Sequence, residues 1–132
     1  LEAPVDRASE QGGLLIVSSE ADFADLVADY LKLKRNYVVR LAETPLVAGM
    51  MLGRFHPQVL LWDEAAPGLD LAGLESASRD SSLQLPRLIL ITDFLTLDHR
   101  AAMESGRLCS VLQKPVSLDM LLESLDRAHE SG

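Results

Sequence analysis

Three polar residues, each placed directly after a short strand-like run, have types and spacing that can do chemistry. They are Asp63 after VLLW (59–62), Thr92 after LILI (88–91) and Lys114 after CSVLQ (109–113). A carboxylate, a hydroxyl and an ammonium group brought together form a polar site in which Lys114 can neutralise Asp63. In open α/β sheets the residues at the carboxyl ends of the strands share one crevice. The spacing therefore predicts that Asp63, Thr92 and Lys114 converge.

The elements that would position these residues follow a repeating pattern from residue 14 onward. The runs predicted to be strands are 14–18, 37–41, 59–62, 88–91 and 109–113. Continuous apolar runs are typical of strands that are covered on both faces. Amphipathic stretches separate the runs, so the chain is expected to form a parallel sheet with helices on both faces. Ser18 and Ser19, which end the first run, should reach the same crevice.

A helix is predicted after each strand. Ser19, Thr44 with Pro45, and Ser117 are typical of helix starts; a helix is also expected over 96–105, and a weak one over Leu71–Ser78. The apolar positions expected to pack are Phe23, Leu26, Val27, Tyr30 and Leu31, then Leu46, Val47, Met50 and Met51, and finally Leu118, Leu121, Leu122 and Leu125.

Composition restricts the class of protein. The chain has 132 residues, 48% of them hydrophobic, which suits one domain with a proper core. Its net charge of −8 disfavours direct binding to nucleic acid, and no apolar run is long enough to cross a bilayer. The single cysteine, Cys109, fits a reducing compartment, so we expect a cytoplasmic protein. Residues 1–13 show no periodicity and are interpreted as a linker that precedes a domain over 14–132.

The order and spacing of these residues resemble a known family. Asp63 is followed by Pro67 and Gly68, Thr92 ends the next long strand, and Lys114 precedes Pro115. This pattern is similar to that of response-regulator receiver domains (CheY-like) of two-component signal transduction, over about residues 14–130. The resemblance implies a flavodoxin-like fold, with a five-stranded parallel sheet in the order 2-1-3-4-5.

The resemblance also implies roles for individual residues. Asp63 matches the position that accepts a phosphoryl group from a histidine kinase during a phosphorelay. Lys114 matches the lysine that pairs with the carboxylate and then with the phosphate. Thr92 matches the hydroxyl that moves toward the phosphate and carries the conformational change.

Three residues depart from the family pattern. Ser18 and Ser19 stand where the family has two acids that complete its magnesium site, and Glu20 lies one position beyond the pair. Magnesium offsets the repulsion between an anionic acceptor and an anionic phosphoryl group. Val111 stands where the family has a switch aromatic. Asp63 and Lys114 sum to zero charge, so we expect no cofactor and weak or absent magnesium binding.

The sequence therefore predicts a signalling module and not an enzyme. The first hypothesis is an atypical receiver that acts mainly through protein contacts, with a signalling partner, an attached effector or kinase domain, or a second copy bound through residues 96–130. The alternative is a working phosphoacceptor receiver phosphorylated on Asp63. A flavin carrier is disfavoured, because aromatics are only 5% of the chain and no glycine-rich phosphate loop follows the first strand. His56, His99 and His129 are scattered along the chain, and no metal site or catalysis is expected of them.

Overall fold

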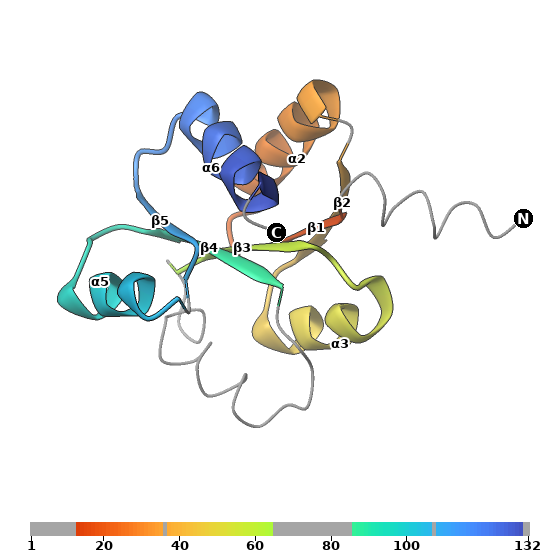
Figure 1. Ribbon diagram of the computed structural model, residues 1–132. Coiled ribbons are helices and arrows are strands. Elements are labelled where there is room, and N and C mark those ends of the chain that lie inside the picture. The colour runs from red at the N-terminus through yellow and green to blue at the C-terminus, as the bar shows by residue number, and fades with distance from the viewer. Residues whose placement is uncertain (1–12, 36, 65–85, 107, 131–132) are drawn as a thin grey trace, which may run out of the picture.

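The computed structural model describes residues 13–35, 37–64, 86–106 and 108–130, which form a parallel sheet with helices on both faces (Figure 1). The five strands lie in the order β2-β1-β3-β4-β5. Their bounds are β1 Gly13–Val17, β2 Val38–Ala42, β3 Val59–Asp63, β4 Arg87–Thr92 and β5 Ser110–Gln113. The predicted flavodoxin-like fold and strand order are confirmed. The helix expected over Leu71–Ser78 lies outside the described residues.

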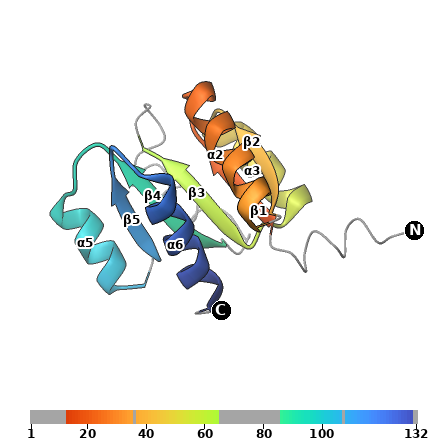
Figure 2. The same ribbon diagram turned by 90° about the horizontal axis from the view of Figure 1, so that it is seen from above.

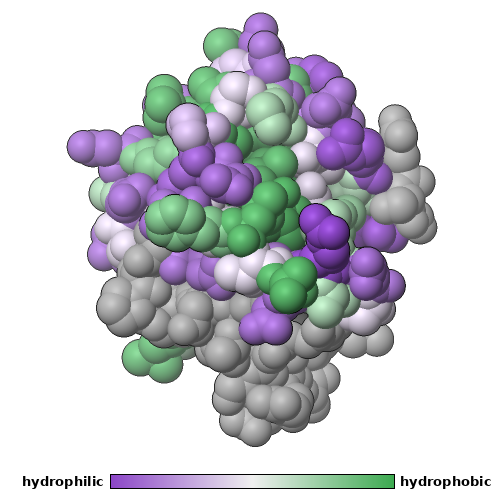
Figure 3. Space-filling model, turned by 90° about the vertical axis from the view of Figure 1, so that its left-hand side faces the viewer, coloured by the Kyte–Doolittle hydropathy of each residue, from purple (hydrophilic) through white to green (hydrophobic). Residues whose placement is uncertain are grey.

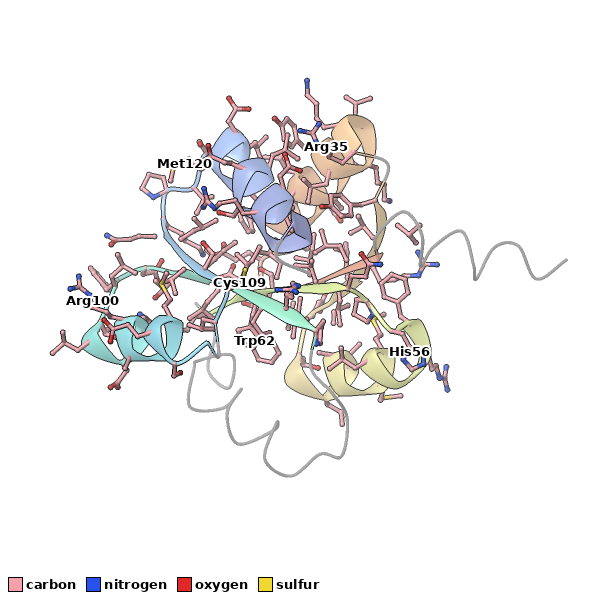
Figure 4. The ribbon with its side chains drawn as sticks, in the orientation of Figure 1. Arg35, His56, Trp62, Arg100, Cys109 and Met120 are labelled. Carbon is pink, nitrogen blue, oxygen red and sulfur yellow. The ribbon has the colours of Figure 1, made fainter. Side chains whose placement is uncertain are left out.

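The helices divide into two layers. They are α2 Ala21–Arg35, α3 Pro45–Phe55, α5 Leu97–Glu104 and α6 Leu118–Glu130. In Figures 1 and 2, α2 and α6 cover one face of the sheet, while α3 and α5 lie on the other. Each layer closes over its own apolar cluster, so β1 and β3 are buried along their whole length. Figure 4 shows Trp62 on the side of α3 and α5, where it belongs to the second cluster.

Helix starts follow the sequence at two of the three predicted caps. The hydroxyl of Thr44 accepts a hydrogen bond from the Val47 amide at 3.2 Å, and that of Ser117 accepts one from the Met120 amide at 3.0 Å. The prediction of Ser19 as a cap is wrong, because α2 begins at Ala21 and Ser19 lies two residues before it. The side chain of Ser18 instead accepts from the Glu20 amide at 3.1 Å.

Two predicted packing faces are also wrong in part. On α3, Leu46 is 75% exposed and Met50 is 57% exposed, and Val47 is exposed as well. Leu26 on α2 is likewise exposed. On α2 the predicted Val27 and Leu31 are buried together with Ala24 and Ala28, and on α3 the buried position is Ala48. Leu46 and Met50 each lie two residues from Ala48, which is about 200° around the helix, so they point away from the sheet when Ala48 faces it. Within the described residues, no helix is both long and apolar enough to cross a membrane.

The α2–α6 layer carries side-chain ties between elements that are distant in sequence. The Tyr30 hydroxyl donates to Asp119 at 2.8 Å, and the Arg35 guanidinium forms an ion pair of 3.0 Å with Asp126. Both ties are exposed, and such surface contacts contribute little to the free energy of unfolding. They link α2 to α6, while the apolar cluster buried beneath these two helices supplies most of the stability.

Buried Tyr37, directly before β2, makes stability depend on alkaline pH. Burial, together with the charge of Asp126, raises the pKa of Tyr37 from 10.0 to about 12, although Arg35 opposes this. Between these values the unfolded chain ionises first, so the free energy of unfolding should fall as the pH rises from about 10 to about 12. Denaturant titrations across this range should show a smaller fall for Tyr37→Phe. An equal fall in both proteins would contradict the prediction.

Candidate functional site

Asp63 is the last residue of β3 and lies at the carboxyl edge of the sheet. Its side chain is only 2% exposed. The hydroxyl of Ser18, the residue after β1, donates a hydrogen bond of 2.9 Å to Asp63 Oδ2. Because β1 pairs with β3 in parallel register, the two strands end side by side and bring these residues together. The predicted convergence of strand ends therefore holds for Ser18 and Asp63, whereas Ser19 is exposed.

Lys114, directly after β5, completes the site. Its Nζ lies 3.2 Å from Asp63 Oδ1 and 3.3 Å from Oδ2, which confirms the expected contact. The same ammonium lies 3.3 Å from Glu20 Oε1 and 5.6 Å from the centre of the Phe23 ring. Burial lowers the pKa of Lys114, but the hydrogen bond and charge of Asp63, together with Glu20, outweigh it and raise the pKa above its usual value. The ammonium form is therefore stabilised.

Glu20 is a site residue that the sequence reasoning missed. It lies one position beyond the serine pair, and its carboxylate reaches Lys114 across the crevice. A count over Asp63 and Lys114 alone gave zero charge, whereas Glu20 makes the cluster one unit negative. Its position between the end of β1 and the start of α2 was the available signal, because that segment lies at the carboxyl edge of the sheet.

The donor set does not fit a magnesium ion well. Magnesium prefers several oxygen ligands in octahedral geometry, usually with one or two carboxylates. Both oxygens of Asp63 lie beside Lys114, and Ser18 offers a hydroxyl that already donates to Asp63. Glu64, the other acid nearby in sequence, binds elsewhere. Over the described part of the chain, no three or more His, Cys, Asp or Glu side chains lie close enough to hold a metal ion.

Thr92 ends β4 beside this cluster, but its hydroxyl is engaged with its own loop. The hydroxyl donates to the Phe94 carbonyl at 3.1 Å and accepts from the Phe94 amide at 3.3 Å. Its backbone carbonyl accepts from the Lys114 amide at 2.9 Å, so the backbones of Thr92 and Lys114 are adjacent. The role of Thr92 as a switch hydroxyl stays a prediction.

The sequence analysis also missed a contact between His99 and Glu64, the residue that follows Asp63. His99 on α5 is 4% exposed, and its Nε2 lies 2.9 Å from Oε1 of Glu64. The His99 Nδ1 accepts a hydrogen bond of 3.1 Å from the Thr96 amide, so the ring proton is on Nε2 and is donated to Glu64. Thr96 in turn caps α5 by accepting from the His99 amide. A helix-start pattern could reveal the cap, whereas the contact with Glu64 spans 35 positions.

Val111 on β5 lines a surface cavity of about 610 Å³ between β5 and α5. Leu95, Leu97 and Met103 are exposed apolar residues of the same cavity. Figure 3 faces this side of the molecule and shows apolar side chains gathered in the middle of the face among polar ones. Because a valine side chain is smaller than an aromatic ring, Val111 fills less of this cavity than the aromatic residue of the family pattern would.

Comparison with solved structures finds proteins of similar fold. A CheY-like response regulator receiver domain from Methanospirillum hungatei JF-1 is 21% identical with a TM-score of 0.75, over 92% of this chain and 98% of its own. The receiver domain of Francisella response regulator 1452 is 17% identical with a TM-score of 0.77, over 91% and 98%. The chain has the receiver fold.

A third similar structure carries a modified site. It is a response regulator from Burkholderia pseudomallei with a phosphorylated aspartic acid, a calcium ion and citrate, 21% identical with a TM-score of 0.71, over 91% of this chain and 70% of that one. No family model matches the sequence, and no curated protein matches it either. At these identities the likeness establishes the receiver fold alone.

Proposed function

We propose that the chain is an atypical receiver module of two-component signalling that acts through protein contacts and not as an enzyme, with weak or absent magnesium-dependent phosphorylation of Asp63. The observation that supports this proposal is that the Asp63 carboxylate is already engaged by neighbouring side chains. Ser18 donates a hydrogen bond to it, and Lys114 Nζ lies within 3.3 Å of both its oxygens. Serines stand where a metal-binding acidic pair is expected. In the described site, Lys114 is therefore the cation that offsets the charge of an approaching phosphoryl group.

Exposure to acetyl phosphate with magnesium, read by intact mass, tests this proposal. We expect little or no mass increase in the unmodified chain, because Glu20 and Asp63 both repel an anionic phosphoryl donor and Lys114 alone offsets them. The matched control is Asp63→Asn. A rapid, stoichiometric increase that disappears in this control would favour the alternative, a working phosphoacceptor receiver like the phosphorylated Burkholderia regulator.

The surface formed by α5, β5 and α6, here residues 96–130, is the proposed contact face for a signalling partner, an attached effector or kinase domain, or a second copy. Leu97, Met103 and Met120 expose apolar side chains on it, and Arg100 also projects from α5 there (Figure 4).

One similar structure is a DNA-binding response regulator of the LuxR family from Staphylococcus aureus. With a net charge of −8, this chain would leave nucleic-acid contact to such an attached domain. Unpaired Cys109 suits a cytoplasmic location.

A further inference from the structure

Two successive acids at the end of β3 reach different parts of the molecule. Asp63 turns into the cluster with Ser18 and Lys114, while Glu64 turns toward His99. This divergence follows from the strand, in which successive side chains point to opposite faces. The Glu64 amide donates to the Ile91 carbonyl of β4 at 2.8 Å, so the backbone that carries both acids is held against β4.

His99 is the buried polar residue of α5. Within this eight-residue helix, which the structure describes in full, the buried side chains are His99 and Ala102. The two nitrogens of the His99 ring serve different elements: Nε2 binds Glu64 at the end of β3, and Nδ1 binds the Thr96 amide at the start of α5. A displacement of Glu64 therefore acts on the cap of α5 through one rigid ring.

We propose that the hydrogen bond between Glu64 and His99 couples the state of the Asp63 site to the first turn of α5. This coupling rests on the proposed receiver function and names its route of regulation. A change at Asp63 that shifts the end of β3 against β4 moves the Glu64 carboxylate with it. His99 then loses its partner or follows it, and either outcome alters the cap at Thr96. His99 and Thr96 also line the cavity beside Val111, so the altered turn belongs to the contact face.

Coupling between sites is reciprocal, and typical values correspond to fivefold or larger changes in an equilibrium. The perturbation used here is Asp63→Asn, which removes the charge paired with Lys114 and needs no phosphorylation. The readout is hydrogen exchange of the amides of residues 99–103. We expect Asp63→Asn to change their exchange rates by about fivefold or more in the otherwise unmodified chain. In the Glu64→Ala background the same substitution should change them by less than about twofold.

Three further variants make the result specific. Glu64→Gln keeps an oxygen that accepts from His99 Nε2, so it should retain the coupling. His99→Gln keeps a side chain that can bind the Thr96 amide, as glutamine does at this helix position, but loses the ring that reaches Glu64; it should abolish the coupling even if Glu64→Ala fails to fold. Tyr30→Phe removes a bond of similar length between α2 and α6, so it should leave the coupling intact.

Two outcomes overturn the proposal. One is no response of α5 to Asp63→Asn in the otherwise unmodified chain, and the other is an equal response in the Glu64→Ala and unmodified backgrounds. Since no arm uses phosphorylation, the coupling can fail while the acetyl phosphate result stands. Conversely, rapid phosphorylation of Asp63 would change the proposed function and leave the coupling measurement valid.

Discussion

Replacing Ser18 and Ser19 together with aspartate should let acetyl phosphate modify Asp63 in the presence of magnesium, at a rate about a hundredfold or more above that of the unmodified chain. The Ser18 hydroxyl lies 2.9 Å from Asp63 Oδ2, so a carboxylate in its place would stand directly beside the acceptor. The carboxylate at position 18 adds a second acid beside Asp63, and the one at the adjacent exposed position 19 adds another oxygen donor at the same strand end, which together favour a cation. Intact mass against time measures the gain. The control, Asp63→Asn added to the double variant, should abolish it.

The double variant should also acquire a magnesium-dependent melting temperature. Without metal it is expected to be less stable than the unmodified chain, because like charges crowd the crevice. If magnesium binds with a dissociation constant of about 1 mM, about 10 mM magnesium adds about 1.4 kcal/mol, a shift of a few degrees. The unmodified chain should respond only as it does to sodium chloride of equal ionic strength. A magnesium-specific rise in the unmodified chain would mean that Glu20 or Glu64 serves as a ligand.

Removing the cation of the site should cost far more stability than neutralising its buried anion. Lys114→Met is expected to lower the free energy of unfolding by about 3 kcal/mol, because the charge of Asp63, which is 2% exposed, loses its compensating ammonium. Asp63→Asn is expected to lower it by less than about 1 kcal/mol. In that variant Lys114, whose side chain is 21% exposed, keeps Glu20 and water as partners. Urea unfolding at neutral pH measures both values.

The asymmetry between the two variants is the diagnostic quantity. Their urea dependence should match that of the unmodified chain, so that the midpoints report stability and not a change in compactness. Glu20→Gln provides a further comparison: its contact with Lys114 is exposed, so the loss should stay within about 1 kcal/mol. Equal losses for Lys114→Met and Asp63→Asn would show that burial of the Asp63 charge does not govern the stability of the site.

The parts of the fold that sequence could predict are those that depend on short, local patterns. Buried strands such as β3 and β4 appear as unbroken apolar runs; β3 is one residue longer than predicted at its end, and β4 is one residue longer at each end. Strand ends in turn predicted the contact of Asp63 with Lys114, because parallel strands deliver their last residues to one edge. Prediction of the strand order needed the family resemblance as well.

The parts that failed depend on contacts between distant elements. Apolar spacing placed Leu46 and Met50 among the packing residues, but α3 turns its opposite side, which carries Ala48, toward the sheet. Likewise, Glu20 and His99 are ordinary polar residues in the sequence. Their partners lie 94 and 35 positions away, and side-chain direction at such separations follows from the packed helices.

The strand order also bears on unwanted aggregation of this chain. Within the described residues it leaves β2 and β5 as the outer strands, and the outer edge of such a strand can template strand addition and aggregation. Both outer strands are short, with five and four residues. Arg40 on β2 is exposed and stacks its guanidinium 5.2 Å from the Phe55 ring, while β5 runs into Lys114 and Pro115. Short length, charge and proline each discourage edge-to-edge pairing. These features disfavour backbone pairing at the sheet margins, so on the proposed face of α5, β5 and α6 side chains and not backbone amides would select the partner.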